Sequence, residues 1–483
     1  MTKNVWVCAG LLALGLVGIG APASRAQGRS AAGGAGGGSE TTTVSATSST
    51  TAAESSAADL RQRIEALKAE LSGLNTQLSA VAESETSAST DIPSQDQGSA
   101  APAQAPAAAP AAAPPAPLSS PSMSGPLATG IPHELPAGPF GKIEITGILS
   151  GMGLFNDTPV AHGDEGHVDI SNAQVFIQKT SGMFQFYLQG GAYNLPVVGN
   201  TLPFLKTGPT TTLNYGPFPV GYVKLVKGNF NVEIGSLPTI IGDEYTFTFQ
   251  NMNIERGLLW AQEPAISRGI QINDTYKKLT LAFSWNDGFY SDRYTSLSGS
   301  LAYAINAANT ITFVGGGNAG NTYARIGAAS FPTPTFQNNE QIYNLIYTYT
   351  KGSWIISPYY QYTVVKSNNA VYGPGNPGAH TNGGAVLFDY AFKHGFSLAL
   401  RPEYIKSSGS VATNEANLLG YGPGTGAFSF TATPTWIKDA FFLRGDVSIV
   451  DLTSFTASAH LGFGIGHTNT NQVRGVIEAG FMF

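Results

Sequence analysis

The sequence predicts an all-β chain whose antiparallel strands close into a transmembrane barrel. Three observations predict this fold. From Lys142 to Phe483, segments of about 9 to 13 residues alternate apolar and polar side chains, as in a barrel that faces two solvents. The connections between these segments alternate between short and long, and the first residues have the pattern of an export signal. A soluble β-sandwich also alternates, so the connections and the export signal separate the two fold classes.

The first residues have the order of a secretory signal peptide. Lys3 precedes an apolar run from Val5 to Ala21, and the triplet Ser24-Arg25-Ala26 stands before Gln27. This order predicts cleavage after residues 1–26. The alternative is an uncleaved membrane anchor, which the glycines in the run disfavour.

The region before the barrel divides by composition into three parts. Residues 27–58 are rich in Gly, Ser, Thr and Ala, and we expect them to be flexible because they offer little apolar surface to bury. Residues 59–82 have a helical pattern, and residues 83–139 are a Pro/Ala-rich linker. The barrel is expected to occupy residues 140–483.

The helical part carries a heptad repeat. Its apolar residues follow one another at spacings of four and three: Leu60, Ile64, Leu67, Leu71, Leu74, Leu78 and Val81. This spacing predicts a short coiled coil, which needs partner helices to be stable in water. We expect a homotrimer through residues 60–81. The alternative is an amphipathic helix that packs against its own barrel or lies on a membrane surface.

The connections predict the number and direction of the strands. The short ones are residues 180–182, 227–229, 277–278, 307–309, 351–353, 393–395 and 438–439. The long ones are residues 156–166, 194–216, 236–264, 286–295, 319–339, 367–381 and 407–427. An even strand number with both termini periplasmic requires residues 452–470 to be another external loop. The prediction is about 16 strands, within a range of about 14–18, around an aqueous lumen.

The ends of the strands fit the same orientation. Aromatic residues that could form an interfacial girdle stand beside short turns: Tyr276, Trp354, Phe396, Trp436 and Phe441. The last strand ends in the aromatic residue Phe483. Such a terminus resembles the segment by which outer-membrane proteins are recognised by the barrel-assembly machinery.

The composition argues against several functions. The net charge of −6 is small for this length and disfavours nucleic acid as a partner. The single cysteine, Cys8, lies in the leader, so the mature chain offers no thiol or disulfide. We find no nucleophile–base pattern and no phosphate-binding glycine loop, so we expect neither an enzyme nor a cofactor.

The barrel region resembles the OmpL-like β-barrel porins. The resemblance depends on the stretches Asn253-Ile254-Glu255-Arg256, Ala261-Gln262-Glu263-Pro264, Arg268-Gly269 and Phe442-Leu443-Arg444-Gly445-Asp446. It implies a channel in the outer membrane of a Gram-negative bacterium, surrounded by lipid and lipopolysaccharide. It supplies no solute and no binding site.

Charged residues on the polar face of the last strands are candidates for the channel lining. The pattern pairs Arg401 with Glu403, Arg444 with Asp446, and Arg474 with Glu478. Opposed charges of this kind could set a transverse field that filters polar solutes. The alternative is ordinary salt bridging that stiffens the barrel wall.

Residues 236–264 form the longest connection with many aromatic and charged side chains. This loop is expected either to fold into the lumen as a constriction or to cap the barrel from outside. With the first residues of the strand that follows, it adds four candidates for the channel lining: Glu255, Arg256, Glu263 and Arg268.

One short loop could hold a divalent cation. It contains His162, Asp164, Glu165 and His167, which are side chains of the kind that bind metals. A hydrated surface loop has the same composition, so this site is the weaker interpretation.

The expected function is a water-filled channel for passive diffusion of small hydrophilic solutes. A structural or adhesive outer-membrane barrel is the first alternative, and a hydrolase embedded in the barrel wall is the second. Solute permeability separates the channel from both.

Overall fold

The computed structural model describes residues 124–128, 132–159, 163, 165–202, 204–320, 337, 339–369, 375–413 and 415–483. The predicted signal peptide, the flexible segment, the coiled coil and most of the linker lie outside the described residues. These assignments therefore stay predictions.

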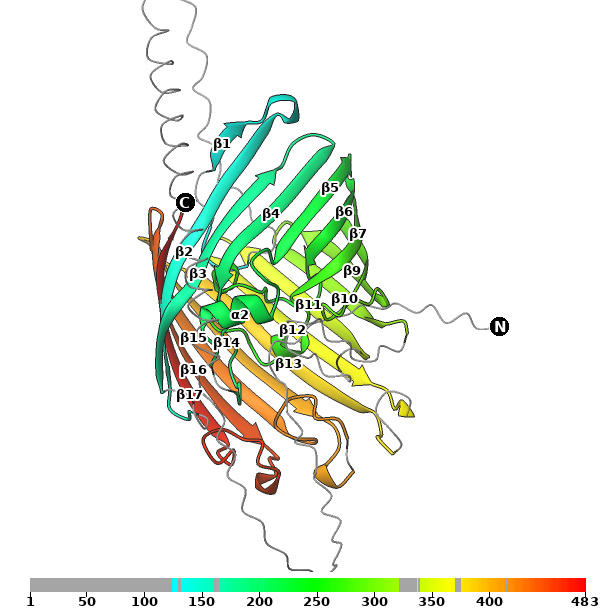
Figure 1. Cartoon of the computed structure of the whole chain (residues 1–483), viewed down its shortest axis with the longest axis vertical. Coiled ribbons are helices and arrows are strands. Elements are labelled where there is room, and N and C mark those ends of the chain that lie inside the picture. The colour runs from blue at the N-terminus through cyan, green and yellow to red at the C-terminus, as the bar shows by residue number, and fades with distance from the viewer. Residues whose placement is uncertain are drawn as a thin grey trace, which may run out of the picture. The chain divides into compact units, whose positions relative to one another are not determined.

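The described chain forms a closed antiparallel barrel (Figure 1). Each strand from β2 to β16 pairs with the next, and β17 pairs with β2, which gives the predicted 16 strands. The strands are β2 Lys142–Asn156, β3 Gly166–Lys179, β4 Phe184–Tyr193, β5 Val220–Lys227, β6 Phe230–Pro238, β7 Ile266–Tyr276, β8 Leu279–Asn286, β9 Ser296–Asn306, β10 Asn309–Asn318, β11 Glu340–Lys351, β12 Trp354–Val365, β13 Ala379–Ala391, β14 Phe396–Ser407, β15 Gly426–Lys438, β16 Phe441–Thr453 and β17 Asn471–Met482.

The helices are short and lie in the connections. They are η1 Gly138–Phe140, α2 Thr207–Leu213, η2 Thr248–Gln250, η3 Trp260–Gln262, η4 Val411–Thr413 and η5 Ala457–Ala459. Within the described residues, no helix is long and apolar enough to cross a membrane.

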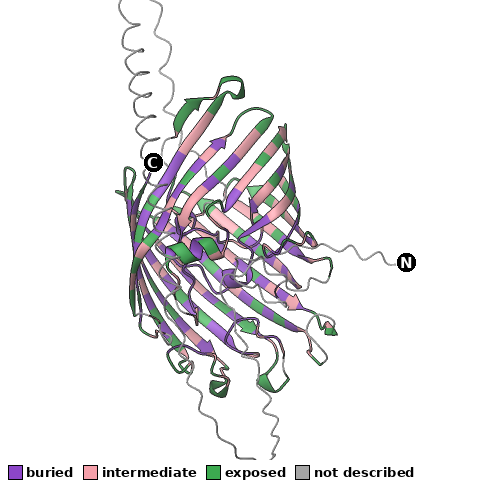
Figure 2. Cartoon of the chain, in the orientation of Figure 1, coloured by how far each residue is buried: buried purple, intermediate pink, exposed green. Residues whose placement is uncertain are grey.

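The strands have an apolar outer face and an inner face that carries most of the polar and charged side chains, because successive side chains point to opposite sides of a sheet. On β16, Leu443 and Val447 are 42% and 56% exposed, whereas the inward Arg444 between them is 1% exposed. Figure 2 shows the same alternation of buried and exposed positions along many strands. The apolar face therefore points away from the lumen, as a strand in a lipid bilayer requires.

The connections confirm the predicted alternation of short turns and long loops. Residues 454–470, which could have formed another strand, are a loop that contains η5 and an isolated bridge between Phe463 and Asn469. The predicted even strand number depended on this segment being a loop.

The barrel closes between its first and last wall strands. The Phe483 backbone N–H donates to the Gly147 carbonyl at 2.9 Å, and the Gly147 N–H donates to the Phe483 carbonyl at 2.6 Å. A side chain at Gly147 would overlap the Phe483 ring, because a Cβ there would lie 2.5 Å from its Cζ. Glycine at 147 thus lets the terminal ring pack across the seam.

A short additional strand, β1 (His133–Pro136), lies within the residues assigned to the linker. It pairs antiparallel with the start of β2, with His133 opposite Ile145. The Lys142 ammonium pairs with the Glu134 carboxylate across the hairpin. Residues that precede the barrel wall therefore add a short strand to its sheet.

Candidate functional site

The connection between β6 and β7, residues 239–265, lies in the barrel lumen, and we call it the lumen loop. It contains η2 and η3 and bonds to inward side chains of β14, β16 and β17. Phe247, Ile254 and Trp260 are each 0% exposed. Of the two positions expected for this loop, the structure shows the one inside the barrel.

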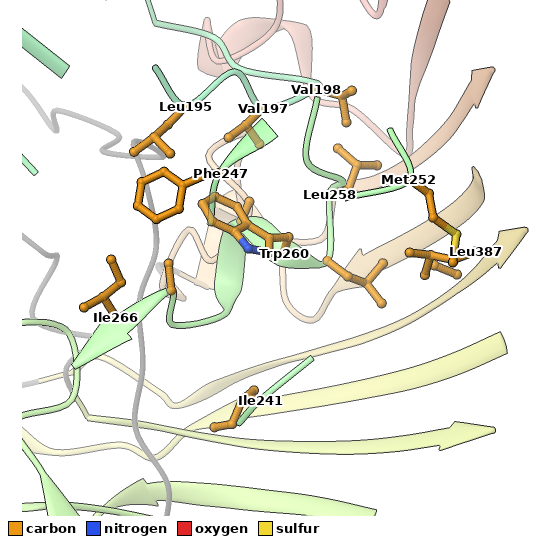
Figure 3. Packing of buried hydrophobic residues seen from close by; sticks show 14 of the residues in the cluster. Leu195, Val197, Val198, Ile241, Phe247, Met252, Leu258, Trp260, Ile266 and Leu387 are labelled. Atoms are coloured by element: carbon orange, nitrogen blue, oxygen red, sulfur yellow. The ribbon is translucent and has the colours of Figure 1, made fainter. Parts of the chain in front are cut away.

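A second connection, residues 194–219 between β4 and β5, packs against the lumen loop. Figure 3 shows Trp260 and Leu258 of the lumen loop beside Val197 and Val198 of this second connection. The Val198 N–H donates to the Arg256 carbonyl at 2.9 Å, and the Arg256 N–H donates to the Pro196 carbonyl at 3.0 Å. The two loops therefore form one packed unit.

On β14, a pair of charged side chains holds the lumen loop. The Arg401 guanidinium donates to the Glu255 carbonyl at 2.7 Å and pairs with the Glu244 carboxylate. The Glu403 carboxylate accepts from the Leu258 N–H at 2.7 Å. Arg401 and Glu403 are 0% and 2% exposed, so both charges are used in binding the loop.

On β16, the next pair does the same. The Arg444 guanidinium donates to the carbonyls of Asn251 and Met252 at 2.8 and 2.7 Å. The Asp446 carboxylate accepts from the Glu255 N–H at 2.8 Å. Here an arginine binds carbonyls and a carboxylate binds an amide of the same loop.

On β17, the third pair completes the attachment. The Arg474 Nη1 lies 2.9 Å from Glu255 Oε1 and also donates to the Val197 carbonyl of the second connection. The Glu478 carboxylate accepts from the Thr248 hydroxyl at 2.7 Å. Strands β14, β16 and β17 thus hold the loop through buried charges. Such an attachment is strong only when every charge finds a partner.

Arg256 and Glu263 lie within the lumen loop itself. The Arg256 Nη2 donates to the Pro196 carbonyl at 2.6 Å, and its guanidinium lies 5.5 Å from the centre of the Trp260 ring. The Tyr359 hydroxyl of β12 donates to Glu263 Oε1 at 3.5 Å. Burial raises the pKa of Glu263 well above its usual range, and the nearby Glu244 raises it further.

Arg268 stands apart from the other candidates. It lies near the start of β7, two residues before the outward Ile270, and so shares its face of the sheet. Its guanidinium pairs with Asp287 and Asp292 at 2.7 and 2.8 Å. In the described chain, Arg268 is not bonded to the lumen loop. The structure therefore separates Arg268 from Glu255, Arg256 and Glu263, the candidates with which the sequence grouped it.

Residues 124–128 also lie in the lumen, although their sequence predicts only a linker. The N–H groups of Ser124 and Gly125 donate to the Gln250 carbonyl at 2.8 and 3.3 Å. The Leu127 side chain is only 5% exposed and packs in the same hydrophobic cluster as the lumen loop. A piece of the predicted linker therefore contacts η2 from inside the barrel.

The proposed cation loop is only partly described. His162 and Asp164 lie outside the described residues. The Glu165 carbonyl accepts from the Asn156 N–H at 2.8 Å, and the His167 Nε2 lies 3.5 Å from Asp169 Oδ2. The metal site therefore stays a prediction.

A closed barrel with an apolar exterior, buried polar and charged side chains on its inner wall and loops folded into its lumen has the structure of an outer-membrane channel. The family described as "Putative beta-barrel porin-2, OmpL-like" matches residues 142–483. The chain belongs to this family of outer-membrane porins, as the resemblance in its sequence indicated.

Several solved structures are similar to the chain. The anion-selective porin from Comamonas acidovorans is 12% identical, over 71% of this chain and 99% of that chain, with a TM-score of 0.47. OmpF of Salmonella typhi, in complex with daunomycin, is 12% identical over 73% of this chain and 100% of its own, with a TM-score of 0.47. The channel DcaP of Acinetobacter baumannii is 9% identical over 71% and 97%, with a TM-score of 0.44. No curated protein sequence matches the chain.

Proposed function

We propose that this porin passes small hydrophilic solutes by passive diffusion and that the lumen loop sets the width of its channel. The observation that carries the proposal is the attachment of this loop to Arg401, Arg444 and Arg474 on the inner wall. A loop held across a lumen by buried charges narrows it at a fixed place. The channel is therefore narrower than a bare barrel of the same strand number would be.

The burial of these charges bears on ion selectivity. The charged residues in and around the lumen loop form a cluster. Its members are the arginines Arg256, Arg401, Arg444 and Arg474 and the acidic residues Glu244, Glu255, Glu263, Glu403, Asp446 and Glu478. All are buried, and ion pairs join arginines to acidic groups within the cluster, so their opposite charges largely offset one another along the solute path. The pairing of these charges supports the interpretation that they hold the loop, and not the interpretation that they filter solutes. We therefore propose a weakly selective channel.

Permeability tests the proposed function directly. The refolded mature chain, placed in liposomes, should admit small sugars faster than large ones in a swelling assay. In planar bilayers it should give discrete conductance steps, and the reversal potential in a KCl gradient should be small. Intact, folded protein with no permeability to any of these solutes would instead support the structural or adhesive barrel.

The chain is proposed to act as a channel and not as a hydrolase. Membership of a porin family supports this proposal. An esterase assay on the refolded protein should show no turnover above that of detergent alone, and measurable turnover would support the embedded hydrolase.

The orientation and the assembly are also proposed. Both ends of the barrel wall lie at its short-turn end, which supports a periplasmic N-terminal region and recognition of Phe483 by the barrel-assembly machinery. The heptads in residues 60–81 support a homotrimer. If a chain without residues 27–123 is still trimeric in detergent, then the heptads do not specify assembly.

A further inference from the structure

A groove in the outer face of the barrel lies over a glycine. Gly384 of β13 stands opposite Tyr360 of β12 on one side and opposite Tyr404 of β14 on the other. Both tyrosines are on the outer face, 47% and 41% exposed. Because glycine has no side chain, a hollow is left between the two tyrosine side chains. The groove has a volume of about 620 Å³.

The groove has polar groups at one end. Asn382 of β13 and Lys406 of β14 are paired, and both lie closer than Gly384 to the end of the barrel that carries the long loops. His380 lies two residues further along β13 in the same direction. The Tyr360 hydroxyl donates to Asn382 Oδ1 at 2.6 Å, which fixes the wall of the groove. The His380 ring lies 5.9 Å from the ring of Tyr362.

The charge at this end is positive. Lys406 is exposed, and its ammonium donates to the Ser454 hydroxyl at 3.2 Å. No acidic side chain lines the groove within the described part of the chain. A cation near the edge of a bilayer, with donors beside it and no carboxylate to neutralise it, suits a phosphate group.

A second groove on the outer face also contains a cation, but that cation is paired with carboxylates. It lies over Gly235 and Gly269 beside Trp285, and its cation is Arg268. That guanidinium is already paired with Asp287 and Asp292. Its charge is therefore neutralised, whereas Lys406 in the groove over Gly384 has no carboxylate partner among the residues that the structure describes.

We propose that the groove over Gly384 binds one phosphorylated lipid of the surrounding leaflet. An acyl chain lies between Tyr360 and Tyr404, and Lys406 with His380 binds the phosphate of the headgroup. The groove faces hydrocarbon on the outer surface of the barrel, so a chain of the bilayer is its natural occupant. With the proposed orientation the long-loop end faces outward, and the lipid is then lipid A of the outer leaflet.

Native mass spectrometry of the mature chain in detergent tests this site. Diphosphoryl lipid A is the probe, and dephosphorylated lipid A and inorganic phosphate are the comparisons. We expect one retained diphosphoryl lipid per chain, about tenfold less retention in Lys406→Gln, and no displacement by inorganic phosphate. Equal retention in Lys406→Gln and the parent chain would overturn the proposal, as would displacement by phosphate alone.

Gly384→Leu tests the hollow itself. A Cβ at 384 would lie 3.4 Å from its nearest neighbour, the Tyr359 carbonyl, so the strand accepts a side chain while the groove is filled. The matched control is Gly445→Leu, because Gly445 has an open outer position opposite the exposed Ile477. Retention should fall only in Gly384→Leu. Unchanged retention there, or a changed oligomer size with retention unaffected, would assign the groove to another role.

This binding test is independent of the channel. Gly384 and Lys406 lie outside the lumen, so conductance of both variants should equal that of the parent chain. Failure of the lipid site would leave permeability intact, and failure of the porin function would leave lipid retention intact.

Discussion

The Arg474 guanidinium of β17 lies 2.9 Å from the Glu255 carboxylate of the lumen loop, and both side chains are almost completely buried. The same guanidinium donates to the Val197 carbonyl. One side chain of the closing strand thus joins two loops that come from elsewhere in the barrel wall. This contact links the strand that closes the barrel to the loop that fills the lumen.

Replacing this arginine should loosen the loop and destabilise the protein. Arg474→Gln leaves the Glu255 carboxylate buried without its cation, and breaking such a pair costs about 3–5 kcal/mol. The free energy of unfolding in urea, followed by tryptophan fluorescence, measures the loss. The double variant with Glu255→Gln should be less destabilised than the sum of the single variants, because the charges are coupled.

A surface ion pair is the matched control for this prediction. Lys142 and Glu134 pair across the hairpin of β1 and β2, and their side chains are 68% and 43% exposed. Lys142→Gln should cost less than about 1 kcal/mol, as expected for an exposed pair. Equal losses in Lys142→Gln and Arg474→Gln would contradict the role given to Arg474.

Removing the lumen loop should widen the channel. In a variant with residues 243–263 replaced by a short Gly-Ser turn, single-channel conductance should rise because the bound segment no longer occupies the lumen. Planar bilayer recordings give the measurement. As a control, shortening the connection at residues 454–470 should change conductance less. Unchanged conductance after deletion of residues 243–263 would show that the loop does not limit the flow of ions.

The segment at residues 124–128 should narrow the channel as well. A Cβ on Gly125 would lie 2.2 Å from the Asn251 carbonyl oxygen, so Gly125→Val should displace this segment and raise conductance. Ala128→Val is the control, because Ala128 is exposed. A chain lacking residues 27–131 should match Gly125→Val. If neither change alters conductance, the segment does not obstruct the path.

Stability should depend on pH through Glu263. Burial raises the pKa of its carboxyl well above the usual value, so the folded protein favours the neutral form. The stability that this group contributes is therefore complete below about pH 4.3, the unfolded pKa, and is lost as pH rises through the folded pKa. Glu263→Gln removes the titration. Its thermal midpoint should exceed that of the parent chain at alkaline pH, and the difference should shrink towards pH 4; a difference independent of pH would contradict this assignment.

The sequence predicted the barrel because period-two alternation fixes the face of every residue in a strand. Arg401, Arg444 and Arg474 could be assigned to the inner face from their apolar neighbours alone, and they do lie there. Arg268 shows the limit of this reasoning. It was grouped with the channel lining by its nearness to the lumen loop, whereas its position in β7 puts it on the face of Ile270.

The partners of the inner charges could not be predicted. Arg444 binds the Asn251 carbonyl, and a backbone acceptor leaves no trace in composition or spacing. Ser124 contacts Gln250, which lies 126 positions further along the chain. The segment around Ser124 is irregular and has no hydrophobic periodicity from which its position could be predicted. Such contacts depend on the shape of the lumen, which exists only once the wall has formed.

The seam between Gly147 and Phe483 sets an order on folding. Phe483 and β17 pair with β2, the first wall strand, so the hydrogen-bond ladder remains open until β17 has been added. Until then β2 and β17 present free edges, which are sites of intermolecular aggregation. Pairing of residues so distant in sequence is also slow because of its entropic cost. A chain truncated before β17 therefore keeps an exposed edge on β2, and a copy of the protein reaches its functional state only after its first and last wall strands have paired.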